Sequence, residues 1–200
     1  DFRNYKHLRM FLHAEEFQGQ GLNDGDLWGF IRIGTDYTNN YYEYSFPLKV
    51  TRAGQNTAEQ IWPEENHMDL VVAYLAALKQ ERDLNGSSLT QPFFSTIHPG
   101  YKIVGTPDIS IIKIICIGIR NPKNDGIKHC GEVWFNELRL EEFNNQGGWA
   151  AEARADVKLA DFGNVRLTSH IHTFGYGALD KKLNERSRDD VRGYAFVSNF

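Results

Sequence analysis

The sequence contains few of the residues that hold small cross-linked domains together. Its 200 residues include only two cysteines, Cys116 in an expected strand and Cys130 in an expected loop. Two cysteines do not make a disulfide scaffold, although a single Cys116–Cys130 bridge stays open as an alternative for an oxidising compartment. Hydrophobic residues make up 41% and aromatic residues 13%. This composition is ample for a packed core and excludes a disordered chain.

The sequence also lacks a long apolar run and an excess of basic residues. The longest apolar stretch, 109–119, contains Lys113 and is too short for a membrane helix. The 22 basic and 26 acidic residues give a net charge of −4, with no basic cluster, so nucleic acid is not an expected partner. The chain begins at Asp1 without a signal segment and stops at Phe200 inside an expected strand. We interpret it as a piece of a longer polypeptide, whose compartment this absence does not reveal.

Recognisable catalytic motifs are absent too. The sequence has no glycine-rich phosphate loop, no nucleophile elbow and no zinc-protease motif. The acidic pairs Glu15–Glu16 and Glu64–Glu65 would point to opposite faces of a strand, whereas glycoside hydrolysis needs two carboxylates that face one cleft. We therefore expect no enzymatic activity and no cofactor.

Two groups of residues have metal-ligand chemistry without the spacing of a known site. His170 and His172 share one face of a strand, but no third ligand is in register, so polar surface or lumen side chains are the favoured interpretation. Four oxygen donors could hold a structural calcium ion, although their spacing matches no calcium-loop signature. They are Glu15, Asp24, Asp26 and Asn136.

Residues 1–146 are predicted to form an antiparallel β-sandwich or jelly roll with one helix. Its last strand, VWFNELRL, resembles that of galactose-binding-like jelly rolls, a fold-level analogy that does not establish sugar binding. Residues 5–14 alternate between inward and outward positions, as a half-buried strand does. The inward set is Leu8, Met10, Leu12 and Ala14, and the outward set is His7, Arg9, Phe11 and His13. The segments 27–35 and 41–50 form a hairpin around Asn39–Asn40, residues that tolerate a tight turn.

The single helix is predicted over residues 64–82, after Pro63. Its apolar residues recur at helical spacing, and two glutamates lie at its N-terminus. The spaced residues are Met68, Val71, Val72, Leu75 and Leu78. The segment 109–119 is apolar on both faces and is predicted to be a central strand covered on both sides. The predicted core includes Ile112, Ile114, Cys116, Trp134 and Leu138.

Four tyrosines gather around the 27–50 hairpin and form a candidate ligand or partner surface. They are Tyr37, Tyr41, Tyr42 and Tyr44. Exposed aromatic rings at a sheet edge could stack on a sugar ring, which would make this a carbohydrate-binding module. The same cluster is also typical of cross-strand aromatic packing, which we favour.

Residues 147–200 are predicted to form an independent antiparallel meander, beginning after the Gly147–Gly148 break. The apolar face of its first strand carries Trp149, Ala151, Ala153, Ala155, Val157 and Leu159. The opposite face carries Glu152, Arg154, Asp156 and Lys158. A run of about ten residues with a short polar turn is typical of a transmembrane barrel hairpin, but a soluble two-faced sheet gives the same alternation. The pattern alone favours the soluble sheet, because barrel signals are weak per segment.

A resemblance to a known family favours the barrel hairpin over the soluble sheet. The motifs GEVWFNELRL, GGWAA and LADFGNV resemble the SprA (Sov) family, outer-membrane translocons of the type 9 secretion system involved in gliding motility. The similarity continues through YKHLRMFLHAE, DLWGFIRIGTD, NNYYEYSFPL, IWPEEN, PGYKIVGTPDIS, IGIRNP and GALDKKLNERSRDD, and so covers nearly the whole chain.

The resemblance implies a non-enzymatic segment of an outer-membrane channel that exports folded cargo. Its partners would be other outer-membrane secretion proteins, the cargo proteins and membrane lipid around 149–200. The apolar residues from Trp149 to Leu159 would then face lipid, and the charged residues from Glu152 to Lys158 would face the lumen. A carbohydrate-binding-like module of a cell-envelope protein stays as the alternative, and a glycan-acting enzyme is least favoured.

Overall fold

The computed structural model describes residues 2–17, 21–123, 126–182 and 185–199. The chain divides into two compact units, Asp1–Phe143 and Asn144–Phe200. All pairs of named strands are antiparallel, so the predicted mainly β, antiparallel fold is confirmed.

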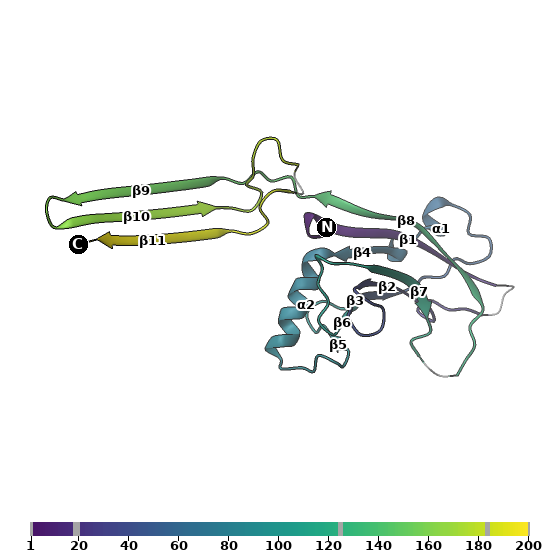
Figure 1. Cartoon of the computed structure of the whole chain (residues 1–200). Helices are drawn as coiled ribbons and strands as arrows, with labels where there is room; N and C mark the ends of the chain where they lie inside the picture. Colours follow the sequence, from purple (N-terminus) through teal and green to yellow (C-terminus); the bar gives the residue numbers. More distant parts are fainter. Residues whose placement is uncertain (1, 18–20, 124–125, 183–184, 200) are drawn as a thin grey trace. The chain divides into compact units, whose positions relative to one another are not determined.

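The first unit contains two sheets and a helix (Figure 1). One sheet has the order β4-β1-β8 and the other has the order β5-β6-β3-β2-β7. The strands are β1 (Tyr5–Glu16), β2 (Trp28–Gly34), β3 (Tyr41–Pro47), β4 (His67–Val71), β5 (Phe93–Phe94), β6 (Tyr101–Val104), β7 (Ile114–Arg120) and β8 (Gly131–Phe143). The helical elements are η1 (Phe2–Asn4), α1 (Ala58–Ile61), η2 (Glu64–Asn66) and α2 (Val72–Leu84).

The core lies between these two sheets. Every residue of the predicted inward set of β1, from Leu8 to Ala14, is buried. At the crossing of the layers, a Cβ atom on Gly29 of β2 would lie 2.7 Å from Leu12 Cδ2 of β1, so glycine permits the close approach. The helix α2 adds Leu75 and Leu78 to the same apolar cluster. From β3, Tyr42 and Phe46 belong to this cluster, and Tyr44 packs against it.

The helix prediction over residues 64–82 is wrong at its N-terminal end. Residues 64–66 form η2, residues 67–71 form β4, and α2 begins at Val72. The Asn66 side chain accepts a hydrogen bond from Lys49 N at 2.7 Å and donates one to Lys49 O at 2.8 Å. Met68 then pairs with Met10 of β1. The alternation of β4 runs directly into the helical spacing of α2, and the combined pattern resembles one longer helix.

The prediction of a central strand at 109–119 is also wrong. The strand β7 is shorter, pairs with β2 and lies at the edge of the five-stranded sheet. Ile115 and Ile119 are exposed, and Ile112, Ile114 and Cys116 are half-buried rather than core residues. The chain continues from β7 to the opposite sheet, where β8 pairs with β1. Cys116 and Cys130 are both free, so the alternative of a bridge between them is contradicted.

Trp134 and Leu138 are not core residues. A bulge changes the inward face of β8 along its length and places Trp134 on the outer face. The register against β1 shifts between Arg9 and Phe11, and Glu137 has a φ of 56°. Extra residues at a bulge reverse the alternation. Val133 and Leu140 therefore both pack on the core, while Trp134 is 55% and Leu138 38% exposed.

His13 was predicted to face outward but is buried. Its ring lies between Trp62, at a centroid distance of 5.7 Å, and Trp134, at 5.4 Å. Its Nδ1 lies 2.7 Å from Ile61 O. The segment that contains α1 thus covers the outer face of β1 at this position, which the β1 sequence alone does not reveal.

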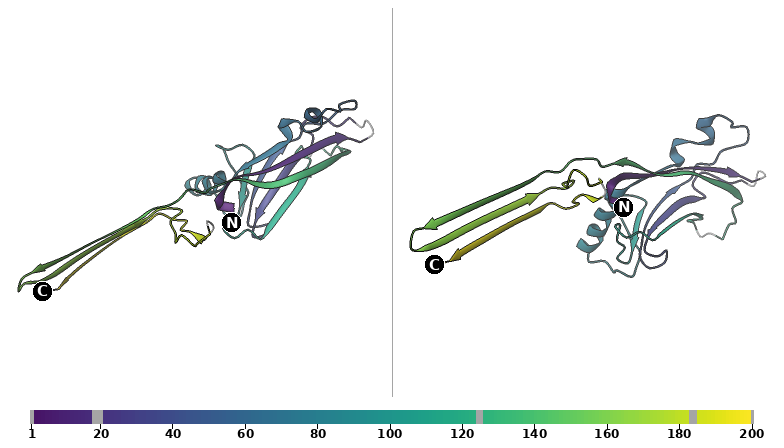
Figure 2. Two further views of the ribbon diagram at one scale, coloured as in Figure 1. Left: turned by 90° about the horizontal axis from the view of Figure 1, so that it is seen from above. Right: turned by 45° about the horizontal axis from the view of Figure 1, so that its top comes forward.

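The second unit is a single sheet with the strand order β11-β10-β9. Its strands are β9 (Ala150–Leu159), β10 (Gly163–His172) and β11 (Val191–Asn199). They lie side by side in one open layer in both views of Figure 2.

Candidate functional site

The two-faced sheet of the second unit follows from strict alternation in three adjacent strands. A turn at residues 160–162 closes the first hairpin, with Phe162 N donating to Leu159 O at 2.8 Å. Ala160 adopts a φ of 43° in this turn. Val165 lies opposite Val157, and Leu167 opposite Ala155, so the apolar residues of both strands share one face.

The third strand extends this apolar face. In the register of β10 and β11, Phe196 lies opposite Leu167, Tyr194 opposite Ser169 and Arg192 opposite Ile171. Large apolar side chains of the face are solvent-exposed: Tyr194 is 77% and Phe196 66% exposed. Every residue of β9 is exposed, so no other element of the second unit covers this strand.

The opposite face is polar and internally paired. Asp156 accepts a hydrogen bond from Arg154 Nε and another from Arg166 Nε of β10, each at 2.6 Å. His170 lies opposite both Glu152 and Gly193. A Cβ atom on Gly193 would lie 2.1 Å from the His170 ring, so the glycine leaves room for this ring to lie across β11.

The predicted assignment of β9 residues to two opposite faces therefore agrees with the strand register. A monomeric soluble protein rarely exposes a large contiguous apolar patch, and a sheet normally buries its apolar face against another layer. An apolar face opposite a polar face is also the alternation that barrel strands show.

The four tyrosines do not form one surface. Tyr42 is 2% exposed, and its hydroxyl donates to Pro107 O at 3.1 Å. Tyr44 packs against Phe46 and Tyr101 on the same inward face. Tyr41 is buried on the opposite face of the sheet, and Tyr37 is 56% exposed in the turn. The structure therefore does not bring these rings together as a stacking platform for a sugar.

A charged cluster on the outer face of the five-stranded sheet was not anticipated. The buried carboxylate of Glu43 contacts Arg32 at 2.5 Å and both Lys102 and Arg120 at 2.8 Å. Burial raises the pKa of Glu43, but hydrogen bonds from Lys102 and Arg32 outweigh it and hold the pKa below its usual value. Burial also lowers the pKa of Lys102. The Arg32 guanidinium lies 4.5 Å from the centre of the Tyr41 ring.

This cluster joins four strands, because Arg32, Glu43, Lys102 and Arg120 come from β2, β3, β6 and β7 respectively. Each cation is already paired with the same carboxylate, so we assign the cluster to stabilising the sheet. The available sequence signal was the presence of charged residues at single positions within otherwise apolar strands.

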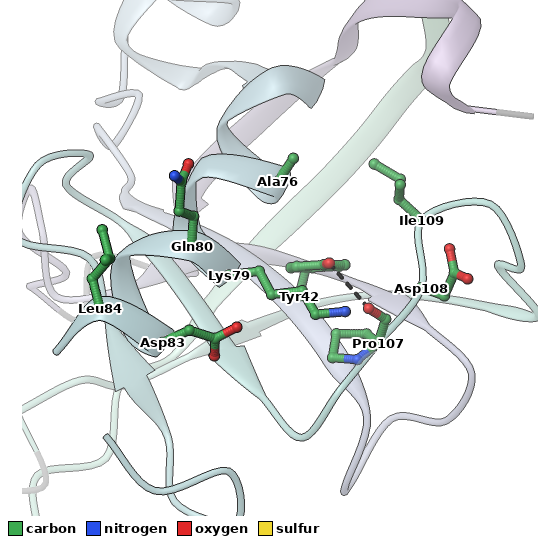
Figure 3. A pocket seen from close by; sticks show the side chains of 9 residues that line it. All are labelled: Tyr42, Ala76, Lys79, Gln80, Asp83, Leu84, Pro107, Asp108 and Ile109. Atoms are coloured by element: carbon green, nitrogen blue, oxygen red, sulfur yellow. Dashed lines mark hydrogen bonds between the residues drawn. The ribbon is translucent and has the colours of Figure 1, made fainter. Parts of the chain in front are cut away.

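A cleft of about 560 Å³ lies between α2 and the loop at residues 107–109 (Figure 3). Ala76, Gln80 and Leu84 line one wall from the helix, and Pro107, Asp108 and Ile109 line the other. The remaining lining residues are Tyr42, Lys79 and Asp83. Burial raises the pKa of Tyr42 to about 12, so its phenol stays protonated at neutral pH. The described lining residues offer no nucleophile paired with a base.

The four residues considered as possible calcium donors are engaged in other contacts. Asp26 contacts Lys123 Nζ at 2.6 Å, Asp24 accepts a hydrogen bond from Val50 N, and Glu15 lies 3.3 Å from His13. Asn136 pairs with Phe11 on the outer face of β8. Within the part of the chain that the structure describes, no group of three or more histidine, cysteine, aspartate or glutamate side chains could hold a metal ion.

None of the helices described here has both the length and the apolar character needed to cross a membrane.

These features define a mainly antiparallel β protein in which a packed sandwich unit precedes a unit made of a single two-faced sheet. The model of the SprA N-terminal family, described as motility related/secretion protein, matches residues 1–200. The chain belongs to this family, which confirms the resemblance seen in its motifs. Comparison with curated proteins gives no match.

Proposed function

We propose that this chain is a non-enzymatic segment of an outer-membrane channel that exports folded cargo in type 9 secretion and gliding motility. Family membership supports a role in motility and secretion. The observation that carries the channel assignment is the apolar face of β9, β10 and β11, which no second layer of its own unit covers, opposite a polar face with internal ion pairs.

In this proposal the second unit supplies strands to a transmembrane barrel in the bacterial outer membrane. Trp149, Val157 and the alanines between them face lipid, while the side chains from Glu152 to Lys158 face the water-filled lumen. The partners are other outer-membrane secretion proteins and the exported cargo. The sandwich unit has a structural or docking role, and the export function requires no cofactor and no catalytic residue.

The matched pair Ala153→Arg and Glu152→Arg tests this proposal in the full-length parent protein. Both positions are exposed, so water would tolerate arginine at either one. Hydrocarbon would not, because a basic side chain on the lipid face costs about 2–4 kcal/mol near the bilayer midplane. We expect Ala153→Arg to reduce assembly in the outer membrane and export of cargo, whereas Glu152→Arg assembles normally.

Measured quantities are the amount of protein in purified outer membranes and the amount of cargo outside the cell. Equal assembly of the two variants would contradict the lipid-facing assignment of Ala153.

A further inference from the structure

The apolar face of the second unit has the height of one membrane crossing. At roughly 3.4 Å per residue, the strand distance from Trp149 to Leu159 is about 34 Å. A strand tilt of about 40° reduces this to about 26 Å, which matches the apolar band of about 25 Å in outer-membrane barrels. Trp149 and Leu159 therefore mark the two boundaries of the hydrocarbon region.

The Trp149 boundary also carries a basic residue. Arg192 of β11 lies opposite Ile171, which lies opposite Ala151, one position along the same face from Trp149. Aromatic residues form girdles at membrane interfaces, and arginine extends its charged group toward the headgroups. No charged residue shares the apolar face in the rows between Ala153 and Val157. The boundary between the hydrocarbon region and the headgroups therefore crosses the sheet near Arg192.

The connections at the two boundaries differ in length. Residues 160–162 make a tight turn beyond Leu159, whereas residues 173–190 connect β10 to β11 at the Trp149 boundary. The long connection has internal structure: Gly175 N donates to Ser187 O and Ser187 N donates to Tyr176 O, both at 2.7 Å. Bacterial outer-membrane barrels have short periplasmic turns and longer extracellular loops.

From these observations we infer the orientation of the sheet: residues 160–162 lie on the periplasmic side and residues 173–190 on the cell exterior. This inference rests on the proposed function. Thr173 N donates to Trp149 O at 3.0 Å, so residues 144–149 approach the sheet at the same boundary as the long connection. The chain thus enters the sheet from the cell exterior.

Single cysteines in the full-length parent protein test the orientation. Leu179 and Phe162 are 100% and 80% exposed, so both positions are open to a reagent. Each is changed to cysteine in a background with Cys116→Ser and Cys130→Ser, and cells are treated with a membrane-impermeant maleimide before and after permeabilisation of the outer membrane. We expect Leu179→Cys to react fully on intact cells and Phe162→Cys to react only after permeabilisation.

Reaction of Phe162→Cys but not Leu179→Cys on intact cells would overturn the orientation and leave the membrane-spanning proposal standing. Reaction of both on intact cells, or of neither, would place the two ends of the sheet on one side of the membrane. Either of those results would overturn the orientation together with the spanning role.

Discussion

The two units of this chain are built from the same alternating strand pattern, but only one of them buries the apolar face. In the first unit, β1 lays its apolar residues against a second sheet, and Leu12 meets Gly29 across the interface. In the second unit, β9 has an equally regular alternation, yet no other element of that unit covers it. Alternation therefore identifies a two-faced sheet, while the medium that its apolar face meets depends on whether a second layer is present.

The largest contrast should appear when the two units are produced separately. Residues 1–143 have a core between two sheets and should unfold cooperatively in water. Residues 144–200 have no second layer and should lack a cooperative transition in water, because a sheet must bury its apolar face to be stable. Circular dichroism melts of both fragments, with and without detergent micelles, measure this difference.

A cooperative melt of the monomeric 144–200 fragment in plain buffer would contradict this difference between the units, because the sheet would then be stable without lipid.

The second-largest expected effect is a loss of stability in the core of the first unit. Leu75 and Leu84 lie on the same helix, but Leu75 is fully buried and Leu84 is exposed. Leu75→Ala should lower the free energy of unfolding by about 2–5 kcal/mol, because it removes buried methyl groups and leaves a cavity. The matched variant Leu84→Ala should change it by about 0.5 kcal/mol or less. Urea denaturation of the 1–143 fragment checks both values, and similar losses would mean that α2 does not anchor this core.

The smallest predicted effect is an acid-dependent one. Two hydrogen bonds lower the pKa of Asp26 to about 2. The larger effect comes from the Lys123 ammonium and the smaller one from Asn23 N. The carboxylate is therefore stabilising above its unfolded pKa of about 4, and that stabilisation is lost as the pH falls through about 2. Asp26→Asn should reduce stability at pH 7 and flatten the loss of stability between about pH 4 and 2.

The control for this prediction is Glu59→Gln at an exposed position. Stability measured against pH for the three 1–143 proteins decides the outcome. A pH profile of Asp26→Asn that is parallel to the unchanged protein would show that this ion pair does not contribute.

Sequence periodicity predicted those parts of the fold in which local pattern and tertiary contacts agree. It identified the inward face of β1, the β2–β3 hairpin and the two faces of β9. It failed where a nonlocal contact decides the backbone conformation. Met68 pairs with Met10 of β1, and this pairing holds residues 67–71 extended where a helix was predicted. Glu137 takes a positive φ at a bulge against β1 and reverses the face of Trp134.

The candidate site also has parts that the local sequence pattern predicts and parts that depend on nonlocal contacts. The apolar and charged sets of β9 could be assigned from alternation alone. The contribution of Tyr194 and Phe196 required the register of β11, and the cluster around Glu43 required the order of four strands. Both depend on pairings between segments that are distant in sequence, and a local pattern does not contain that information.

The most direct measurement of the central claim compares adjacent positions on the two faces of β9. Single cysteines are placed at Ala153, Val157, Arg154 and Lys158 in the full-length parent protein, in a background without Cys116 and Cys130. The protein is labelled in membranes with a water-soluble maleimide and with a lipid-partitioning probe. Cysteines at Ala153 and Val157 should react with the lipid probe and resist the water-soluble reagent, and those at Arg154 and Lys158 should do the reverse. Equal reaction of all four positions with the water-soluble reagent would contradict the membrane-spanning role of this sheet.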